Sequence, residues 1–272
     1  MQPASIQSGV AVTNSWELFV TFLSATISGA IGAFVAAWIL QRYIDKNRKI
    51  AELSRDIHLV NVAIYSTSMV ANQFFQMKVQ FVKSIRANHL ANIAEFEKNL
   101  AEGLSEPTKI DLNFLTLEVP IPVTSRIEKL VLEDFSEVSR ATQLAMQLIV
   151  TEAQFLDLIV KRNEMIEHFK STQDSTGERH RYLESYLGRN SKTGHRADDT
   201  SFHDVLVGLS NSNDDGLMFS KLLLDDLVKI GVRKRSELLK LDKKSSVDVV
   251  SVELDEMANE LPDINQYSSW FR

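Results

Sequence analysis

The feature that most constrains this chain is an uncharged apolar run near its N-terminus. Residues 18–40 read LFVTFLSATISGAIGAFVAAWIL, 23 residues without an ionisable side chain. As a helix this run would be roughly 35 Å long, which exceeds the ~30 Å hydrocarbon core of a bilayer. A soluble core helix is rarely apolar on every face over such a length. We therefore expect a transmembrane helix over 18–40, with Trp16, Trp38 and Tyr43 at the two interfaces.

The charges that flank this run predict its orientation. Residues 1–17 contain no Lys or Arg, whereas Arg42, Lys46, Arg48, Lys49 and Arg55 follow the run closely. Basic residues near a span stay on the cytoplasmic side. We expect a short extracytoplasmic tail over 1–17, a single pass through the cell (cytoplasmic) membrane and a body in the cytoplasm. A cleaved signal peptide fits poorly because the run is too long and lacks a basic N-terminal flank.

Composition narrows the fold and chemistry of the remainder. The chain has no cysteine, which excludes disulfides, cysteine-ligated zinc, iron–sulfur clusters and thiol nucleophiles. Glycine and proline number only 10 and 5 of 272 residues, which argues against a turn-rich β fold. We also find no second apolar stretch that approaches spanning length, so the expected protein crosses the membrane once.

Apolar periodicity predicts three long helices, at 45–100, 125–170 and 214–244. The first contains neither Gly nor Pro, should continue the span and should end at Gly103. The second can begin with a capping box formed by Ser125 and Glu128, or with Thr124 as the cap. The third has acidic residues at its start and basic residues at its end, which suits a helix dipole. Shorter helices are expected near 180–187 and 202–209.

These patterns predict an all-α fold with a single N-terminal transmembrane helix and a cytoplasmic three- or four-helix bundle over 45–244. The bundle should be built on two long antiparallel helices, 45–100 and 125–170, whose apolar stripes cover one another. Residues 113–123 alternate like a short strand, which its prolines would confine to an edge. Residues 245–272 form an acidic C-terminal tail that we expect to be exposed.

No catalytic motif stands out. Histidines and carboxylates gather in the polar linker between 178 and 204, where His180, His195 and His203 are the weak candidates for metal ligands. Their spacing lacks the i, i+4 pairing of a helical H-E-x-x-H site. The chain has neither a P-loop nor a G-x-G-x-x-G sequence nor a G-x-S-x-G elbow. We name no catalytic residue and expect no cofactor, and the identity of any metal is unknown.

Two other patterns suggest contacts with partners. Small residues repeat along one side of the span and predict a membrane-assembly face made of Ser28, Gly29, Gly32, Ala33 and Ala36. Basic residues near the end of the third helix suggest an anion or lipid contact: Arg233, Lys234, Arg235, Lys243 and Lys244. The simpler alternative is that the acidic tail folds back on them. The tail can also dock to a cytoplasmic protein, whereas a net charge of −6 does not favour nucleic acid.

Together these patterns favour a membrane-anchored, non-enzymatic helical protein. It would act as a scaffold, sensor or effector through self-association and a cytoplasmic partner. Two alternatives remain open. One is a membrane-tethered enzyme with a His and acidic site within 178–204, and the other is a homo-oligomeric pore-forming effector. Convergence of the three linker histidines on one point would favour the enzyme.

Overall fold

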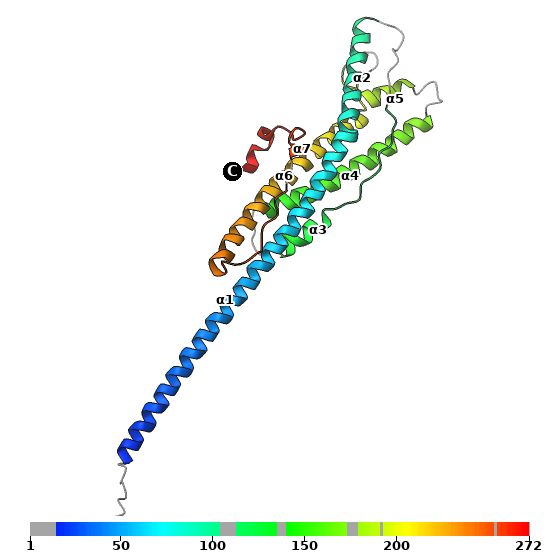
Figure 1. The fold of residues 1–272 in the computed structure, drawn as a ribbon. Coiled ribbons are helices and arrows are strands. Elements are labelled where there is room, and N and C mark those ends of the chain that lie inside the picture. The colour runs from blue at the N-terminus through cyan, green and yellow to red at the C-terminus, as the bar shows by residue number, and fades with distance from the viewer. Residues whose placement is uncertain are drawn as a thin grey trace, which may run out of the picture.

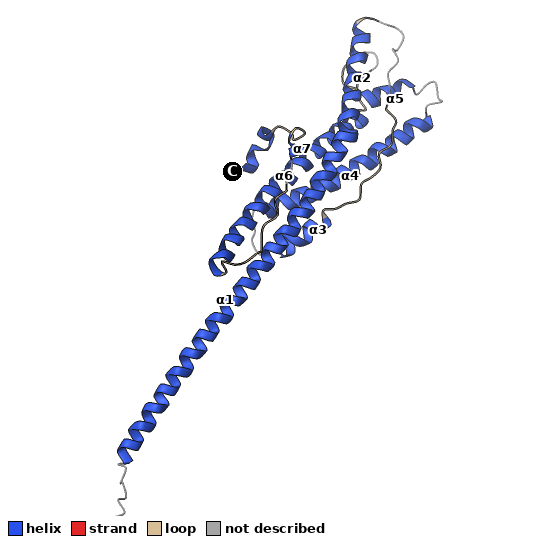
Figure 2. Cartoon of the chain, in the orientation of Figure 1, coloured by secondary structure: helices blue, strands red, loops and turns tan. Residues whose placement is uncertain are grey.

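The structure is a computed structural model that describes residues 15–103, 113–134, 140–172, 179–190, 193–252 and 255–271. Within these ranges the chain is helical, with extended connections and no strand, which confirms the all-α class (Figure 2). Strand-like pairing is limited there to one isolated antiparallel bridge between Arg189 and Arg196.

One continuous helix forms the axis of the molecule. α1 (Ser15–Met77) passes through a π-helical stretch, η1 (Lys78–Val82), into α2 (Lys83–Ala101). The helix runs unbroken because 45–100 contain no Gly or Pro, and it ends at Gly103, whose φ of +65° is left-handed. The expected continuity of the apolar run with the first long helix is thus confirmed (Figure 1).

The N-terminal half of α1 stands apart from the rest of the chain (Figure 1). Residues 16–49 are all exposed, including the whole apolar run. By length and composition two helices of the described chain could cross a membrane, this one and Arg140–Ser171. None of the apolar window of the first is buried, whereas 39% of the second window is buried within the fold. Part of the predicted helix 125–170 thus also passes this test, which overturns our expectation that no second apolar stretch approaches spanning length.

After α2 the chain returns in an extended conformation instead of turning directly into a second helix. Residues 113–123 form a strap that lies along α4 (Arg140–Thr172). The Asn163 side chain binds both backbone groups of Leu117, at 2.9 and 2.7 Å, and Glu152 accepts from the amide of Val123 at 3.0 Å. The expected edge strand is therefore wrong, because side chains of a helix satisfy this backbone.

The strap also overturns the expected antiparallel hairpin of 45–100 and 125–170. Because the strap carries the chain back along the body, α4 runs in the same direction as α1. Both helices are antiparallel to α6 (Ser201–Leu241), which makes the main helix-to-helix packing with each of them. The register shows this directly: on α6, Gly231 lies against Val60 and Gly216 against Phe74, while Asp226 binds Arg140 and Gly208 lies against Leu158.

The second predicted helix starts at the expected residue, Ser125. α3 (Ser125–Glu128) continues as π-helical η2 (Lys129–Asp134), and residues 135–139 lie outside the described residues before α4 begins. Thr124, the alternative we weighed, is the N-cap residue, but its hydroxyl donates to Glu152 instead of capping the helix. The expected capping box of Ser125 and Glu128 is wrong for that reason.

The third predicted helix begins 13 residues earlier than expected, because 202–209 and 214–241 belong to the single 41-residue helix α6. It ends at Leu241, three residues before the expected end at 244. The polar stretch that suggested a break packs against α1. Asn213 is fully buried and donates to the carbonyl oxygen of Phe74 at 3.0 Å. Asp214 pairs with Lys78 at 2.7 Å, so it bridges two helices and does not mark a helix start.

The core lies where α1, α4 and α6 meet. Phe74 and Phe155 are buried there, as their stripes predicted, with ring centroids 5.2 Å apart. A smaller cluster of Leu53, Ile57 and Leu238 joins α1 to the end of α6 nearest the exposed half of α1. We call this end of the body proximal and the end that carries α2 and α5 (Arg179–Leu187) distal (Figure 1).

The C-terminal segment is docked on the body, contrary to the exposed tail we expected. Residues 245–252 are extended, and α7 (Asp255–Ala258) and 3₁₀-helical η3 (Ile264–Phe271) follow. Tyr267 is buried at 7% exposure, with its ring edge-on to Phe219 and its hydroxyl donating to Asp215. Burial and Asp215 raise the pKa of Tyr267, so its phenol is protonated. The side chain of Phe271 lies outside the described residues.

Candidate functional site

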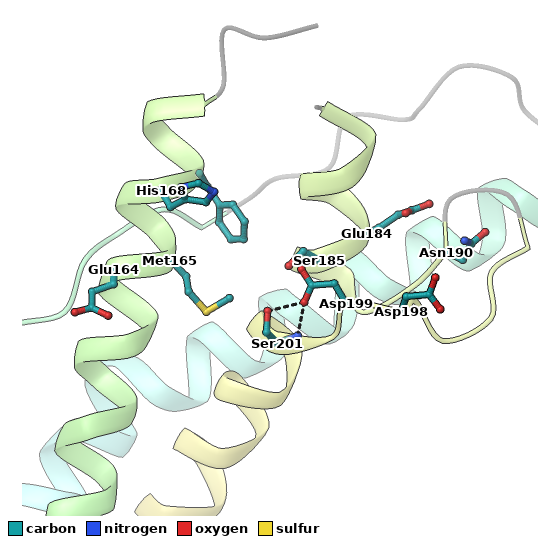
Figure 3. A pocket seen from close by; sticks show the side chains of 10 residues that line it. Glu164, Met165, His168, Glu184, Ser185, Asn190, Asp198, Asp199 and Ser201 are labelled. Carbon is teal, nitrogen blue, oxygen red and sulfur yellow. Dashed lines mark hydrogen bonds between the residues drawn. The ribbon is translucent and has the colours of Figure 1, made fainter. Parts of the chain in front are cut away.

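A cavity opens at the distal end, between α4, α5, the loop after α5 and the start of α6 (Figure 3). Its volume is about 750 Å³, within the size range of small-molecule sites. We call it the distal pocket. It is lined by Glu164, Met165, His168, Phe169, Glu184, Ser185, Asn190, Asp198, Asp199 and Ser201.

Local turn chemistry fixes one wall of this pocket. Asp199 accepts hydrogen bonds from the amide of Ser201 at 3.0 Å and from its hydroxyl at 2.6 Å (Figure 3). These bonds favour the ionised form and lower the pKa of the Asp199 carboxyl. They also support the first turn of α6, next to its N-cap Thr200. Asp199 therefore carries its charge at neutral pH.

The lining of the distal pocket is acidic. Glu164, Glu184, Asp198 and Asp199 supply four carboxyl groups, and His168 is the only basic or imidazole side chain among the lining residues. Such a lining attracts cations and repels anions. Within the described residues, however, no three His, Cys, Asp or Glu side chains lie close enough together to hold a metal ion.

A histidine pair lies beside the pocket, between α2 and α6, with His89 buried and His203 half-buried. His89 Nε2 and His203 Nδ1 are 2.9 Å apart, and His89 is only 3% exposed. Burial, His203 and Arg189 lower the pKa of His89 to about 4. Burial is also the main cause that lowers the pKa of His203, partly opposed by Asp204. Both rings are therefore neutral at physiological pH, and one donates to the other.

Aromatic packing encloses this pair. The Tyr186 ring meets His89 edge-on at 5.6 Å and stacks on Phe202 at 4.7 Å. Gly188, with φ of +64°, brings the backbone so close to His203 that a Cβ there would lie 3.0 Å from the histidine Cβ. The glycine after α5 thus serves a close approach as well as a turn.

A buried arginine holds the strap to the distal end. Arg162 is fully buried and its Nη1 donates to the carbonyl oxygen of Leu115 at 2.7 Å. Its Nε and Nη2 have no hydrogen-bond partner among the residues that the structure describes, and burial lowers the pKa of its guanidinium to about 10. An ionised group buried with so few partners is costly, so this position matters for the stability of the strap.

The predicted metal residues do not converge in the described chain. His203 points to His89, a residue that the sequence analysis did not single out, and His195 is exposed in the loop after α5. The side chain of His180 lies outside the described residues. His89 could have been noticed because it falls on the buried stripe of its helix with Ile85 and Phe96, where an imidazole requires a partner.

The predicted assembly face lies on the exposed half of α1. A Cβ added at Gly29 or Gly32 would meet nothing within 4 Å. The described part of the chain thus leaves the predicted face uncovered: Ser28, Gly29, Gly32, Ala33 and Ala36 are all exposed. Contact of this face with a second copy remains a prediction.

The predicted basic cluster is divided between internal and external roles. Lys234 pairs with Asp56 on α1 at 2.6 Å, and Arg235 pairs with Asp248 of the C-terminal segment at 3.0 Å. The second pair is the folding back of the acidic tail that we considered as the simpler alternative. Lys243 and Lys244 are exposed at the turn after α6.

Comparison of the chain with protein-family models, with curated proteins and with solved structures finds no match.

Proposed function

We propose that this chain is a single-pass membrane protein whose helical body is held in the cytoplasm by residues 18–40. The observation that carries the proposal is the uninterrupted helix Trp16–Ala101, which joins a fully exposed apolar run to the packed core. Leaving so many large apolar side chains in water would be unfavourable by roughly 25 cal/mol per Å². A lipid bilayer would bury these side chains in hydrocarbon. Arg42 lies 4.1 Å above the Trp38 ring, and such a pair is typical of the interface between membrane and water.

The anchor and its orientation are tested together. A phosphatase fused after Arg272 should be inactive in a bacterial host, and a fluorescent protein at the same position should be bright, because the basic residues that follow the run stay inside. The full chain should leave the membrane fraction only with detergent. An active C-terminal phosphatase would show that the orientation is the reverse of the one proposed. Release of the chain by salt alone would show that residues 18–40 do not anchor it in the membrane.

We further propose that the protein works without catalysis, as a scaffold, sensor or effector. Its body carries a histidine pair and an acidic pocket at the end remote from the proposed membrane, joined to the span by one continuous helix. This arrangement suits the transmission of a binding event, because one helix connects the pocket end of the body to the span. The tethered enzyme and the oligomeric pore remain the alternatives.

Self-association through the span is the part of this proposal with the sharpest test. Gly29 and Gly32 lie about 60° apart around the helix, and their missing side chains permit close backbone contact. The double variant Gly29→Leu, Gly32→Leu should stay in the membrane but lose crosslinked oligomer. Ile27→Phe places comparable bulk on the opposite side, about 140–160° from both glycines, and should leave crosslinking unchanged. Equal crosslinking of the double variant and the parent would show that the span only anchors.

A further inference from the structure

A second cavity lies at the proximal end of the body, and no role has been assigned to it above. Its volume is about 530 Å³, and it is formed by one face of α6 and by the extended segment that follows α6. We call it the proximal pocket. It is lined by Val228, Val232, Arg235, Ser236, Leu239, Lys240, Lys243, Asp248, Val249, Val250 and Ser251.

The lining is divided into an apolar wall and a basic mouth. Valines and one leucine make the wall, and Val232 is 55% exposed there. Arg235, Lys240 and Lys243 carry three positive charges against the single negative charge of Asp248, which leaves a net charge of +2. Asp248 is already bound to Arg235 at 3.0 Å. Neither Lys240 nor Lys243 forms an ion pair with any residue that the structure describes.

The pocket lies at the end of the body nearest the proposed membrane. Leu241, at the end of α6, packs into the small cluster that also includes Ile50 of α1. Ile50 is ten residues beyond Leu40, so this level lies about 15 Å above the end of the apolar run. Headgroups occupy roughly the first 5–7 Å of that distance. The remaining distance is covered by the length of a lysine side chain and by electrostatic attraction, which extends over a Debye length of about 8 Å. Any tilt of α1 from the membrane normal shortens this distance.

We propose that the proximal pocket binds the headgroup of an anionic phospholipid from the leaflet that faces the body. Lys240 and Lys243, at the end of the pocket nearest the span, contact the phosphate. The inference rests on the proposed function, since it requires the span to hold the body at this height.

The experiment uses the full chain in neutral detergent micelles. Because the chain has no cysteine, Ser236→Cys places a single environment-sensitive fluorophore on the pocket lining, and Ser251→Cys places one on the segment opposite. Each labelled protein is titrated with short-chain phosphatidylglycerol, with short-chain phosphatidylcholine and with inorganic phosphate. We expect saturable emission changes with phosphatidylglycerol at both positions, and none with phosphatidylcholine.

Charge variants identify the contacts. Lys240→Gln and Lys243→Gln should each weaken phosphatidylglycerol binding about five-fold, as expected for a lysine at an anionic lipid surface. The matched controls are Lys161→Gln and Lys170→Gln, each of which also removes one positive charge but breaks only an exposed one-turn ion pair on α4. These controls should bind like the parent. A fluorophore at the exposed, distal Ser171→Cys should not respond to any of the three probes.

The outcomes separate this inference from the membrane anchor. Membrane extraction that requires detergent, together with a flat titration or an equal response to both lipids, would overturn the lipid site and leave the anchor intact. Saturation by inorganic phosphate at the same affinity would assign the pocket to a free anion and overturn the lipid. A full chain that stays soluble without detergent would contradict the proposed membrane anchor, and the lipid site, which depends on the anchor, would be contradicted as well.

Discussion

At the scale of single residues, the distal end of the body depends on polar groups that the core encloses. His89 is buried against His203 and Tyr186, with Arg189 close enough to disfavour a positive charge. The folded protein therefore holds His89 neutral over a pH range in which the unfolded chain protonates it. Protonation of His89 in the unfolded chain therefore opposes folding, and the free energy of unfolding should rise with pH across that range.

Stability should accordingly fall as pH is lowered from about 6.5 to about 4, by on the order of 3 kcal/mol from His89 alone, and His203 acts in the same direction. His89→Gln keeps a donor near His203 but removes the titration, so its stability should depend less on pH in this interval. Denaturant unfolding at several pH values measures the difference. The control is His58→Gln at an exposed position, whose free energy of unfolding should change with pH as that of the parent does. The prediction would be contradicted if the pH dependence of His89→Gln ran parallel to that of the parent.

Two glycines of α6 provide a matched pair for packing. A Cβ at Gly216 would lie 2.4 Å from the ring of Phe74, whereas a Cβ at Gly208 would lie 3.4 Å from Leu158, an ordinary contact. Gly216→Ala should therefore destabilise by about 1–3 kcal/mol through overpacking. Gly208→Ala should stabilise by roughly 0.5–1 kcal/mol, because alanine is the better helix former.

A double-mutant cycle checks the cause. Phe74→Leu removes the ring that the new methyl group would strike, so the cost of Gly216→Ala should be smaller in that background. Thermal unfolding of the four chains gives the coupling free energy. Additive effects would mean that Gly216 does not approach Phe74 as described.

At the scale of elements, the strap is held by side chains and not by a sheet. Pro120 and Pro122 lack amide donors, so 113–123 is poorly suited to a paired strand. Asn163 and Glu152 of α4 supply the missing partners instead. Glu152 is 2% exposed and accepts three hydrogen bonds, two of them from the amide and hydroxyl of Thr124.

Glu152→Ala should destabilise the fold by about 2–4 kcal/mol, because it leaves three donors of the strap without their acceptor. Glu152→Gln should cost less, since the amide retains one oxygen. Thermal unfolding followed by circular dichroism measures both. The control is Glu167→Ala, which removes only an exposed ion pair with Lys170 and should change stability by less than about 0.5 kcal/mol.

At the scale of the whole molecule, α6 is the central helix that unites the body. It packs against α1 and α4, and the C-terminal segment closes over it through Tyr267. The core residues come from 53 onward, and none comes from the exposed half of α1. The body therefore satisfies its apolar faces without the apolar run.

A chain that lacks residues 1–41 should consequently be soluble without detergent, predominantly helical and cooperative in unfolding, because it retains the complete core. Circular dichroism and analytical ultracentrifugation test this. Aggregation in the absence of detergent, or a broad unfolding transition, would show that the membrane segment contributes to the fold of the body.

The sequence alone determined the features that depend on local pattern. The apolar run, the continuous helix through 45–100, the helix near Ser125 and the burial of Phe74 and Phe155 all follow from side-chain periodicity and from where Gly and Pro occur. The predicted assembly face and basic cluster could be located on their helices, but their partners could not be derived from pattern.

Only the tertiary structure decided how these elements meet. Sequence periodicity does not encode direction, so it could not show that the strap makes α4 parallel to α1. Periodicity also indicated a break between two helices at 210–213. It could not show that Asn213 is buried, because that burial depends on Phe74, 139 residues away. His89 and His203 are separated by 114 residues, and Tyr267 and Asp215 by 52. Polar residues that look solvated in a local window become core residues when a distant segment supplies the missing hydrogen bond, and only the folded chain places that segment.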